Sequence, residues 1–341
     1  MKKVGLLGGS FDPVHKGHIA LAKKALKECK LDKIYFILAY SQPFKQKHVE
    51  SFENRYKLLE IAVKDFKKLE ACDIERSLSQ PSYTYNTVMA LKNKEPDTKF
   101  VWIIGDDSLE DLDKWYKLEK LLKEIDFVVV NRNNLNSSYN FKKIDFQNSA
   151  SSTKIRQGKF YYLDKNVRNK IFENKMYLKH ILFQRLSEKR AKHVLRCIDV
   201  ALEIGKYYNV NETDLLKATA LHDISKELDK KEELKIMKEY FPEHLNLNPK
   251  IYHQYTATII AKRDFCIFDK KILAAIASHT TGDNTSLLAM LTFVADKVER
   301  GRSYEVEDYI SLCKKNIYQG FKKVKNDAEK ARKKKELKIS E

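Results

Sequence analysis

Two glycines and two histidines near the start of the chain have the types and spacing of a phosphate-binding turn. An apolar run, Val4–Leu7, leads into Gly-Gly-Ser-Phe-Asp-Pro-Val-His-Lys-Gly-His over residues 8–18, and a helical pattern follows as far as Cys29. In a strand–turn–helix arrangement, backbone N–H groups and the helix N-terminus face a phosphate, and glycine permits close approach of a ligand or a positive φ. His15 and His18 can each donate a hydrogen bond to a phosphate oxygen. The segment therefore predicts a nucleotide-phosphate site.

A second stretch offers similar chemistry far along the chain. Ser-Ser-Thr-Lys-Ile-Arg, residues 151–156, combines hydroxyls, the N–H groups of a helix start and an arginine one turn in. Alone it is typical of an ordinary capped helix. Beside the first motif it favours a phosphate clamp.

The elements that must position these residues alternate in type through the first half. Strand-like apolar runs are separated by helical patterns, which predicts a doubly wound α/β domain with a mostly parallel sheet and right-handed crossovers. Ligands in such folds bind beyond the carboxyl ends of the strands. The expected strands are Val4–Leu7, Ile34–Ala39, Cys72–Ile74, Phe100–Ile104 and Phe127–Val130, and the expected helices are His18–Cys29, Phe52–Phe66, Tyr85–Asn93 and Asn166–Asn174.

With these motifs in place, residues 1–178 resemble the bacterial nicotinate-nucleotide adenylyltransferases, which are HxGH nucleotidyltransferases with a Rossmann-like fold. The resemblance implies ATP and nicotinate mononucleotide as substrates and deamido-NAD and pyrophosphate as products. It carries the family's ATP site onto Gly8, Gly9, Ser10, Phe11, His15, His18, Asp107, Ser152, Thr153 and Arg156. It carries the nicotinate-reading elements onto Thr84, Trp115 and Tyr116.

The implied reaction needs little covalent help, because the attacking phosphate is already an anion near neutral pH. The enzyme must align the attacker with the α-phosphate and neutralise charge as pyrophosphate leaves. We assign that task to His15, His18, Lys45, Arg156 and a Mg²⁺ ion. Family members often carry His-Lys after a proline pair in the loop that follows the second strand. This chain has Pro43-Phe44-Lys45, so only the lysine transfers.

The second half, residues 179–341, reads as all-α, with the junction expected at 178–184. The expected helices are Ser187–Tyr208, Glu212–Ile224, Lys230–Tyr240, Tyr255–Lys262, Lys270–Ser278, Ser286–Val298 and Val306–Ala331. His193, His222-Asp223 and Asp296 each lie beside an apolar helical run, and His253 and His279 add two imidazoles. A carboxylate beside so apolar a run is costly unless it is paired or bound to a metal.

This order of ligands resembles the HD phosphohydrolases, and more narrowly the bacterial HD-domain diadenosine tetraphosphatases. The narrower match rests on His222-Asp223-Ile224-Ser225-Lys226, His279-Thr280-Thr281-Gly282 and residues 295–300. The resemblance implies symmetrical cleavage to two ADP and an iron centre, and imidazole–carboxylate sites also suit Mn²⁺ or Zn²⁺. Four histidines and two aspartates suffice for one or two metals, with Asp223 bridging as a catalytic ligand. Lys226, three residues on, is expected on the same helix face, within reach of a substrate phosphate.

The composition sets further bounds. A length of 341 residues favours two domains, and the net charge of +18 suits polyanionic partners. Five scattered cysteines without a CxxC pair indicate free thiols in a reducing cytoplasm. No apolar run approaches the ~20 residues of a membrane helix. The basic stretch Lys322–Lys338 is interpreted as a solvated helix end, because no aromatic pattern for nucleic-acid stacking accompanies it.

Two other functions remain open from sequence. The first domain would accept nicotinamide mononucleotide instead, while the HD domain acts on another nucleotide phosphoester. In a different class, the HD half would be a metal-stabilised nucleotide sensor or a basic RNA-binding module. Metal-dependent turnover separates the enzyme from the sensor, and salt-dependent RNA retention would identify the binding module.

Overall fold

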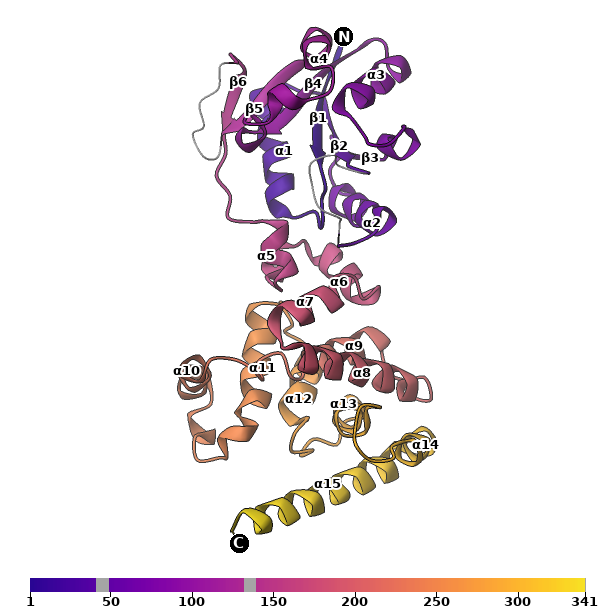
Figure 1. Ribbon diagram of the computed structural model, residues 1–341, viewed down its shortest axis with the longest axis vertical. Helices are drawn as coiled ribbons and strands as arrows, with labels where there is room; N and C mark the ends of the chain where they lie inside the picture. The colour runs from indigo at the N-terminus through magenta and orange to yellow at the C-terminus, as the bar shows by residue number, and fades with distance from the viewer. Residues whose placement is uncertain (41–48, 132–138, 341) are drawn as a thin grey trace. The chain divides into compact units, whose positions relative to one another are not determined.

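The computed structural model describes residues 1–40, 49–131 and 139–340, and their contacts divide the chain into two compact units (Figure 1). One unit consists of residues 1–156 and 162–171, and the other of residues 157–161 and 172–341.

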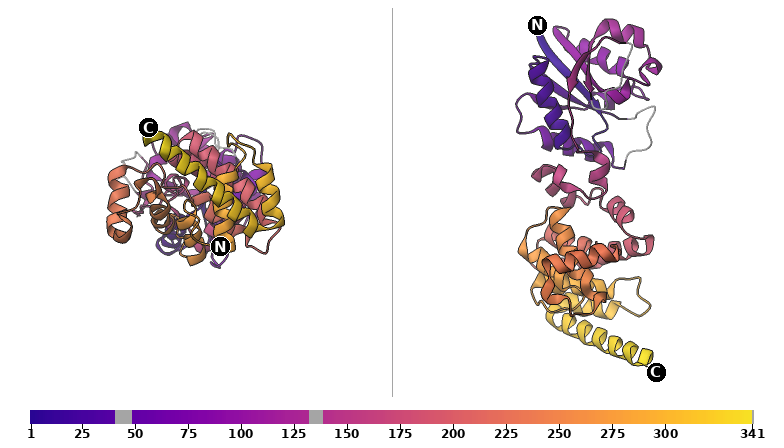
Figure 2. Two further views of the ribbon diagram at one scale, coloured as in Figure 1. Left: turned by 90° about the horizontal axis from the view of Figure 1, so that it is seen from below. Right: turned by 90° about the vertical axis from the view of Figure 1, so that its left-hand side faces the viewer.

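The first unit contains a six-stranded, wholly parallel sheet in the order β3-β2-β1-β4-β5-β6. Helices cover both faces, which confirms the doubly wound α/β prediction (Figure 2). The strands are β1 Lys2–Gly9, β2 Lys33–Leu38, β3 Leu69–Cys72, β4 Thr98–Gly105, β5 Asp126–Asn131 and β6 Lys142–Asp145. The helices are α1 Lys16–Glu28, α2 Phe52–Val63, α3 Thr84–Lys94, α4 Leu118–Glu124, α5 Ser152–Arg156 and α6 Lys165–Glu173.

The core of this unit follows from alternation along the central strands. Val4 and Leu6 of β1 are buried with Val88 and Leu91 of α3 and with Leu121 of α4. Because side chains alternate across a strand, the residues between them point to the opposite face. The carboxyl ends of the parallel strands share one edge of the sheet, and the predicted nucleotide turn begins there, directly after β1.

The strands differ from expectation in two places. The expected strand Cys72–Ile74 is displaced: β3 ends at Cys72, and a 3-10 turn begins at Ile74. Strand β6 was not expected, because it buries only Ile144 and therefore carries almost no apolar pattern.

The second unit has no strand among its described residues, which confirms the all-α prediction. Helix α13 lies at its centre and packs against α8, α9, α12 and α15. The helices are α7 Leu178–Arg185, α8 Glu188–Gly205, α9 Glu212–Leu221, α10 Lys230–Tyr240, α11 Tyr252–Arg263, α12 Lys270–Ser278, α13 Leu287–Val298, α14 Glu307–Lys315 and α15 Ile317–Ser340.

Two helix boundaries in this unit differ from expectation. The expected helix Val306–Ala331 is two helices, because Asn316 adopts an extended φ of −153° between α14 and α15. The residues of the expected junction, 178–184, belong to α7. Helix α9 ends at Leu221, so His222 and Asp223 lie in the turn that follows it.

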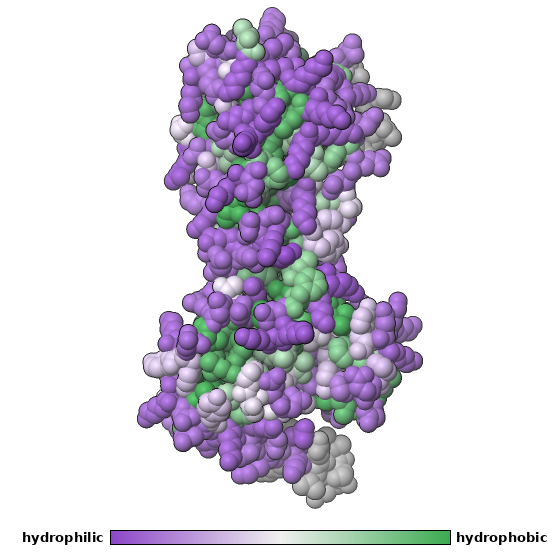
Figure 3. All heavy atoms as spheres, turned by 180° about the vertical axis from the view of Figure 1, so that it is seen from behind, coloured by the Kyte–Doolittle hydropathy of each residue, from purple (hydrophilic) through white to green (hydrophobic). Residues whose placement is uncertain are grey.

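The visible face of both units is mostly hydrophilic, with apolar side chains in smaller patches between charged ones (Figure 3). Within the described parts of the chain, every helix is too short or too polar to cross a bilayer.

Candidate active sites

The turn after β1 is shaped by close packing of its aromatic residues. Gly8 and Gly9 are the last residues of the strand, and neither has a positive φ; Phe11 takes the left-handed conformation instead, with φ 43°. A Cβ on Gly8 would lie 2.9 Å from the Trp102 ring, and one on Gly9 would lie 3.0 Å from the Phe11 ring. The glycines are therefore required here for space beside aromatic rings.

The two histidines of the turn form one stacked unit at the N-terminus of α1. Their ring centroids are 3.7 Å apart, and the Phe11 ring meets His18 edge to face at 4.9 Å. The backbone N–H of His15 donates to Nδ1 of His18 over 3.2 Å. An imidazole that accepts at Nδ1 carries its proton at Nε2 when neutral. His18 thus offers an N–H donor at the helix N-terminus, where anions are favoured.

The second predicted phosphate motif is bound to the first. At the start of α5, the Ser152 hydroxyl donates to the carbonyl oxygen of Pro13 over 2.8 Å. The Arg156 guanidinium donates to the carbonyl oxygen of Asp12 and lies 3.3 Å from the Thr153 hydroxyl. The structure therefore brings together two segments about 140 residues apart, as the phosphate-clamp hypothesis requires.

A buried arginine that the sequence analysis missed holds this turn in place. Arg55 of α2 is 1% exposed, and it donates to the carbonyl oxygens of Ser10 (2.7 Å) and Ala39 (3.0 Å). Its Nε also donates to the carbonyl oxygen of Glu50 over 3.3 Å. A single arginine in a helical pattern normally lies on the surface, so nothing in the sequence marked it.

The predicted acceptor residues gather around α3 and the loop before α4. Thr84 is the first residue of α3. Its neighbour Tyr83 stacks on the exposed Tyr116 ring, with the centroids 4.6 Å apart. Trp115 packs against Phe127 at 6.4 Å, on the core side of the same loop. The two predicted aromatic residues therefore have different surroundings, and Tyr116 is the more accessible.

Two further predicted residues stand apart from these contacts. Asp107 lies in the 3-10 turn after β4 and is exposed, whereas the adjacent Asp106 of the same turn is fully buried. Lys45 lies outside the described residues. The buried Glu75 accepts hydrogen bonds from the backbone N–H of Tyr40 and from the hydroxyl of Thr87, and its burial raises the pKa of this carboxyl.

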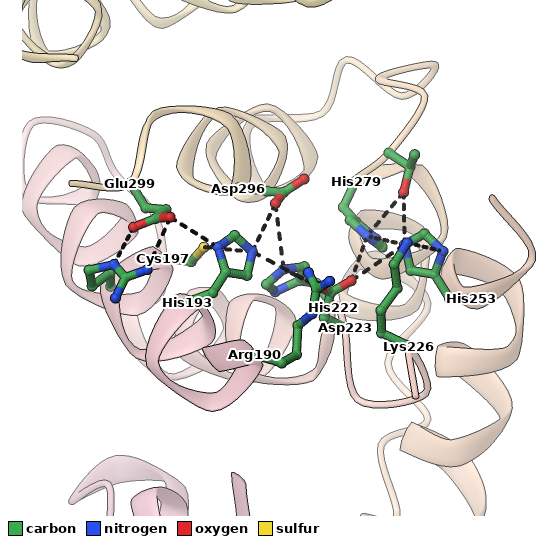
Figure 4. A network of polar contacts seen from close by, with 12 residues as sticks. Arg190, His193, Cys197, His222, Asp223, Lys226, His253, His279, Asp296 and Glu299 are labelled. Atoms are coloured by element: carbon green, nitrogen blue, oxygen red, sulfur yellow. Dashed lines mark hydrogen bonds and ion pairs between the residues drawn. The ribbon is translucent and has the colours of Figure 1, made fainter. Parts of the chain in front are cut away.

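In the second unit, the four predicted metal histidines converge from α8, from the turn after α9, from α11 and from the end of α12 (Figure 4). Three of them fix Nδ1 on a backbone carbonyl: His222 on Thr219 (2.6 Å), His253 on Lys250 (3.0 Å) and His279 on Ile276 (2.7 Å). The Nδ1–H donates in each bond, so each Nε2 keeps a lone pair. Metal-binding histidines are held in the same way.

The fourth histidine uses a carboxylate in place of a carbonyl. Nδ1 of His193 lies 3.2 Å from Oε1 of Glu299, which is buried and also accepts from Arg196. Glu299 was not among the residues predicted from the sequence. Its position three residues after Asp296, one turn along the same stretch, was the available signal.

Two aspartates lie between these imidazoles. Oδ1 of Asp296 is 3.1 Å from Nε2 of His193 and 3.9 Å from Nε2 of His222. Oδ1 of Asp223 is 3.4 Å from Nε2 of His253 and 3.5 Å from Nε2 of His279. Its Oδ2 faces His193 and His222 at 3.8 and 3.7 Å. Asp223 therefore touches both halves of the cluster, as a bridging ligand would.

Burial and charge set the protonation of these groups. Desolvation lowers the pKa of His222 to about 4 and that of His253 to about 2, so both imidazoles are neutral at pH 7. Burial by itself would raise the pKa of Asp223, but His222 and His279 outweigh it and hold that pKa well below its usual range. His222 and His253 thus present neutral imidazoles, and Asp223 presents a charged carboxylate, the forms that bind metals.

Basic residues surround the carboxylates. Arg190 binds Oδ2 of Asp223 over 2.8 Å, and Lys297 binds Oδ2 of Asp296 over 2.7 Å. Nζ of Lys226 lies 3.0 to 3.1 Å from the ring nitrogens of His253. Lys226 is in the turn after α9 and not on a helix face as expected, yet it still borders the cluster.

The donor set fits a metal ion. Among the residues that the structure describes, Nε2 of the fully buried His222 finds no hydrogen-bond partner, which is costly unless a cation occupies its lone pair. Donor atoms of His193, Cys197, His222 and Asp296 lie within 4.8 Å of one another, as do those of His222, Asp223 and His279. Imidazole and carboxylate donors together suit Fe, Mn and Zn.

Comparisons with known proteins agree with this division. The sequence model of the Cytidylyltransferase-like family matches residues 6–158, and that of the HD domain matches residues 190–301. A probable nicotinate-nucleotide adenylyltransferase/Ap4A hydrolase of Mycoplasma genitalium is 28% identical over 340 residues, covering 94% of this chain and 96% of that protein.

Two further relatives match about half of the chain. A probable nicotinate-nucleotide adenylyltransferase of Bacillus cytotoxicus is 36% identical over 187 residues, which are 52% of this chain and 99% of that protein. The solved Plasmodium falciparum nicotinic acid mononucleotide adenylyltransferase complexed with NaAD is 21% identical with a TM-score of 0.44, covering 52% of this chain and 98% of that one. The chain belongs to the nicotinate-nucleotide adenylyltransferase family and joins this nucleotidyltransferase domain to an HD domain.

Proposed function

We propose that residues 1–178 transfer the adenylyl group of ATP to nicotinate mononucleotide, and that residues 179–341 hydrolyse dinucleoside polyphosphates such as diadenosine tetraphosphate. Both substrate classes match the names of the relatives. The proposal for each half rests on one observation in its own unit.

For the first half, the main supporting observation is that α5 contacts the turn that contains His15 and His18. The Nε2–H of His18, the α1 N-terminus and the Arg156 guanidinium lie around one turn at the carboxyl end of β1. Donors fixed in this way stabilise the charge that develops on the triphosphate, and a bound Mg²⁺ would neutralise more of it. No general base is needed, because the attacking phosphate is already an anion. Lys45 is proposed to assist.

For the acceptor, we propose that Thr84, Trp115 and Tyr116 bind the nicotinate ring and its carboxylate. The exposed Tyr116 ring lies against Tyr83 at the start of α3, where backbone N–H groups are unpaired within the helix. A carboxylate satisfies such donors, whereas an amide would present its NH₂ to some of them. We therefore propose the acid as the preferred acceptor.

For the second half, the main supporting observation is the arrangement of four imidazoles. Their Nδ1 atoms are held by backbone carbonyls or by Glu299, and their Nε2 atoms converge on Asp223 and Asp296. We propose that these six residues hold one or two transition-metal ions, with iron the first candidate. A bound metal would supply hydroxide at neutral pH and polarise a phosphoryl oxygen. The chain's own contribution is to orient the ligands and to surround the anionic substrate with Arg190, Lys226 and Lys297.

The test is to separate the two activities in the intact chain. Asp223→Asn keeps the shape of the side chain but removes the charge shared by both groups of histidines. We expect ADP release from diadenosine tetraphosphate and bound metal to fall together, with deamido-NAD formation nearly unchanged. His18→Ala should lower deamido-NAD formation and leave ADP release and bound metal nearly unchanged.

Measurements on one preparation decide the question. If both activities fall in Asp223→Asn while the circular dichroism spectrum stays native, the modular proposal is wrong. If ADP release survives loss of the metal, the metal proposal is wrong. A wild-type protein with bound metal that releases no ADP would reject the proposed substrate.

A further inference from the structure

Glu75 is a buried carboxyl group that has no part in the chemistry proposed for either unit. It lies in the 3-10 turn Ile74–Ser77, just beyond the carboxyl end of β3. One oxygen, Oε2, accepts the backbone N–H of Tyr40 over 3.2 Å, and the other, Oε1, accepts the hydroxyl of Thr87 over 3.1 Å. A carboxyl group is costly to bury unless its oxygens are hydrogen-bonded, so these two contacts fix the side chain.

The Tyr40 contact ties the carboxyl group to the nucleotide turn after β1. The residue before Tyr40, Ala39, donates its backbone N–H to the carbonyl oxygen of Gly9 over 2.9 Å. The carbonyl oxygen of Ala39 accepts from Arg55, and the same guanidinium nitrogen donates to the carbonyl oxygen of Ser10. Oε2 therefore holds a segment that is bonded to this turn through both its N–H and its C=O.

The Thr87 contact ties the same carboxyl group to the predicted acceptor segment. Thr87 lies on α3 three residues after Thr84, so the two side chains are on one face of the helix. The carbonyl oxygen of Glu75 also accepts from the side-chain amide of Gln80 over 3.2 Å, and the oxygen of that amide accepts from the Ser82 hydroxyl over 3.0 Å. The loop before α3 and the first turn of α3 are thus both fixed to Glu75, with Thr84 between the attached residues.

Adenylyl transfer depends on how these two parts are spaced. The proposed sites lie on different elements, with ATP on β1, α1 and α5 and the acceptor on α3 and the loop before α4. The reacting atoms must come within about 3–3.5 Å in line, and a misplacement of about 1 Å can lower the rate about 10²-fold. Because the two oxygens of one carboxyl group have a fixed separation, a side chain that holds one part with each oxygen also fixes the spacing between them.

We propose that Glu75 is a positioning residue for adenylyl transfer, which aligns the acceptor with ATP by holding the nucleotide turn through Tyr40 and the start of α3 through Thr87. It acts through these segments and not by contact with a substrate. Its loss therefore slows the reaction of the complex with both substrates more than it weakens the binding of either one. The inference rests on the proposed function for the identity of the reaction.

The test compares Glu75→Ala with Glu95→Ala in the full chain. Glu95 lies at the other end of α3 and accepts from the hydroxyls of Tyr35 (2.9 Å) and Thr98 (3.3 Å), at the amino end of β4. Each variant thus loses a carboxyl group that attaches α3 to the sheet. The single-turnover rate of deamido-NAD formation is measured at saturating substrates. Calorimetry gives the dissociation constants of ATP and of nicotinate mononucleotide, each alone, and circular dichroism confirms folding.

The rate and the affinities are expected to separate. In Glu75→Ala the single-turnover rate should fall about tenfold or more, while each dissociation constant stays within about threefold of the wild-type value. Glu95→Ala should keep the wild-type rate. Glu75→Gln should keep most of the rate, because its carbonyl oxygen can accept from Tyr40 and its NH₂ can donate to the Thr87 hydroxyl. A purely structural role would weaken substrate binding and slow turnover together.

A near-normal rate in a folded Glu75→Ala protein overturns the inference, as does an equal loss of rate in Glu95→Ala or a parallel loss of substrate affinity. Thr87→Val keeps the shape but removes the hydroxyl, and it decides the question if the alanine variant does not fold. It should lower the rate about threefold or more with unchanged affinities, and Thr87→Ser should restore the rate. An unchanged rate in Thr87→Val also overturns the inference. If the wild-type protein forms no deamido-NAD, it is the proposed function that fails.

Discussion

Replacing Glu299 with glutamine tests whether a carboxylate outside the ligand set tunes the metal centre. Oε1 of Glu299 accepts the Nδ1–H of His193 at 3.2 Å, and Oε2 accepts from Arg196 and from the backbone N–H of Gly301 at 2.6 Å. A carboxylate can only accept, so it fixes the His193 proton on Nδ1 and leaves Nε2 as the ligand atom. Glutamine replaces one acceptor with an NH₂ group, which must face one of these donors.

The size of the effect follows from these contacts. A hydrogen bond to a charged group contributes about 1.5–3 kcal/mol, and one to a neutral group about 0.5–1.5 kcal/mol. Glu299 is 2% exposed, so solvent screens little of the difference. A loss of about 1.4 kcal/mol of hydrogen-bond free energy corresponds to a tenfold weaker metal complex. Mutating the outer hydrogen-bond partner of a metal-binding histidine typically lowers metal affinity about 10–100-fold. We therefore expect a rise of at least about tenfold in the metal dissociation constant.

The assay is calorimetric titration of the metal-stripped full chain with Mn²⁺, with circular dichroism to confirm folding. Glu203→Gln is the matched control, because the ion pairs of Glu203 among the described residues are with Arg300 and Lys314, at 2.6 Å each, and not with the four histidines. Phosphohydrolase turnover at saturating metal should change much less than affinity. Wild-type affinity in a folded Glu299→Gln protein would refute the reasoning, as would equal weakening in both variants.

Three further outcomes are expected. His18→Ala should lower kcat for adenylyl transfer by about 10²-fold or more with little change in melting temperature, since its Nε2–H donor acts on developing charge; near-normal turnover would make it a structural residue. Nicotinate mononucleotide should have a higher kcat/KM than its amide, and equal values would contradict the acceptor proposal. Hydrogen bonds to Arg300 and, with a smaller effect, to Lys314 lower the pKa of Glu203 from 4.5 to about 2. The contribution of the charged Glu203 to folding stability is therefore complete above pH 4.5 and is lost as the pH falls toward 2. Glu203→Gln should therefore lower the free energy of unfolding at pH 7 by less than about 1 kcal/mol, because solvent reaches both partners of the pair. Urea denaturation should show the difference vanishing near pH 2.

Local patterns in the sequence were enough to predict the two fold classes. The apolar runs that became β1, β2, β4 and β5 are buried on both faces, so their composition marks them clearly. Strand β6 escaped because one buried residue, Ile144, leaves no pattern. The break at Asn316 escaped because polar residues on either side continue a helical pattern without interruption.

The sequence also determined which residue types do the chemistry, because histidines and aspartates beside apolar runs are costly without a partner. His193, His222, Asp223, His253, His279 and Asp296 were predicted as one cluster, and the fold brings all six together. Only the tertiary structure decided how each is held. The Nδ1 anchors of three histidines are backbone carbonyls, and carbonyls are the same at every position of a sequence.

The supporting residues show the same limit. Arg55 and Arg190 look like ordinary surface charges in the sequence, and only its position three residues after Asp296 distinguishes Glu299, since the contacts of all three depend on partners up to about 100 residues away. Arg55 is buried because three backbone carbonyls from separate segments meet its guanidinium. Glycines 8 and 9 were predicted from the needs of a ligand, whereas the rings of Trp102 and Phe11 already require them. Burial and long-range hydrogen bonds arise only when the chain packs, so these assignments had to come from the folded structure.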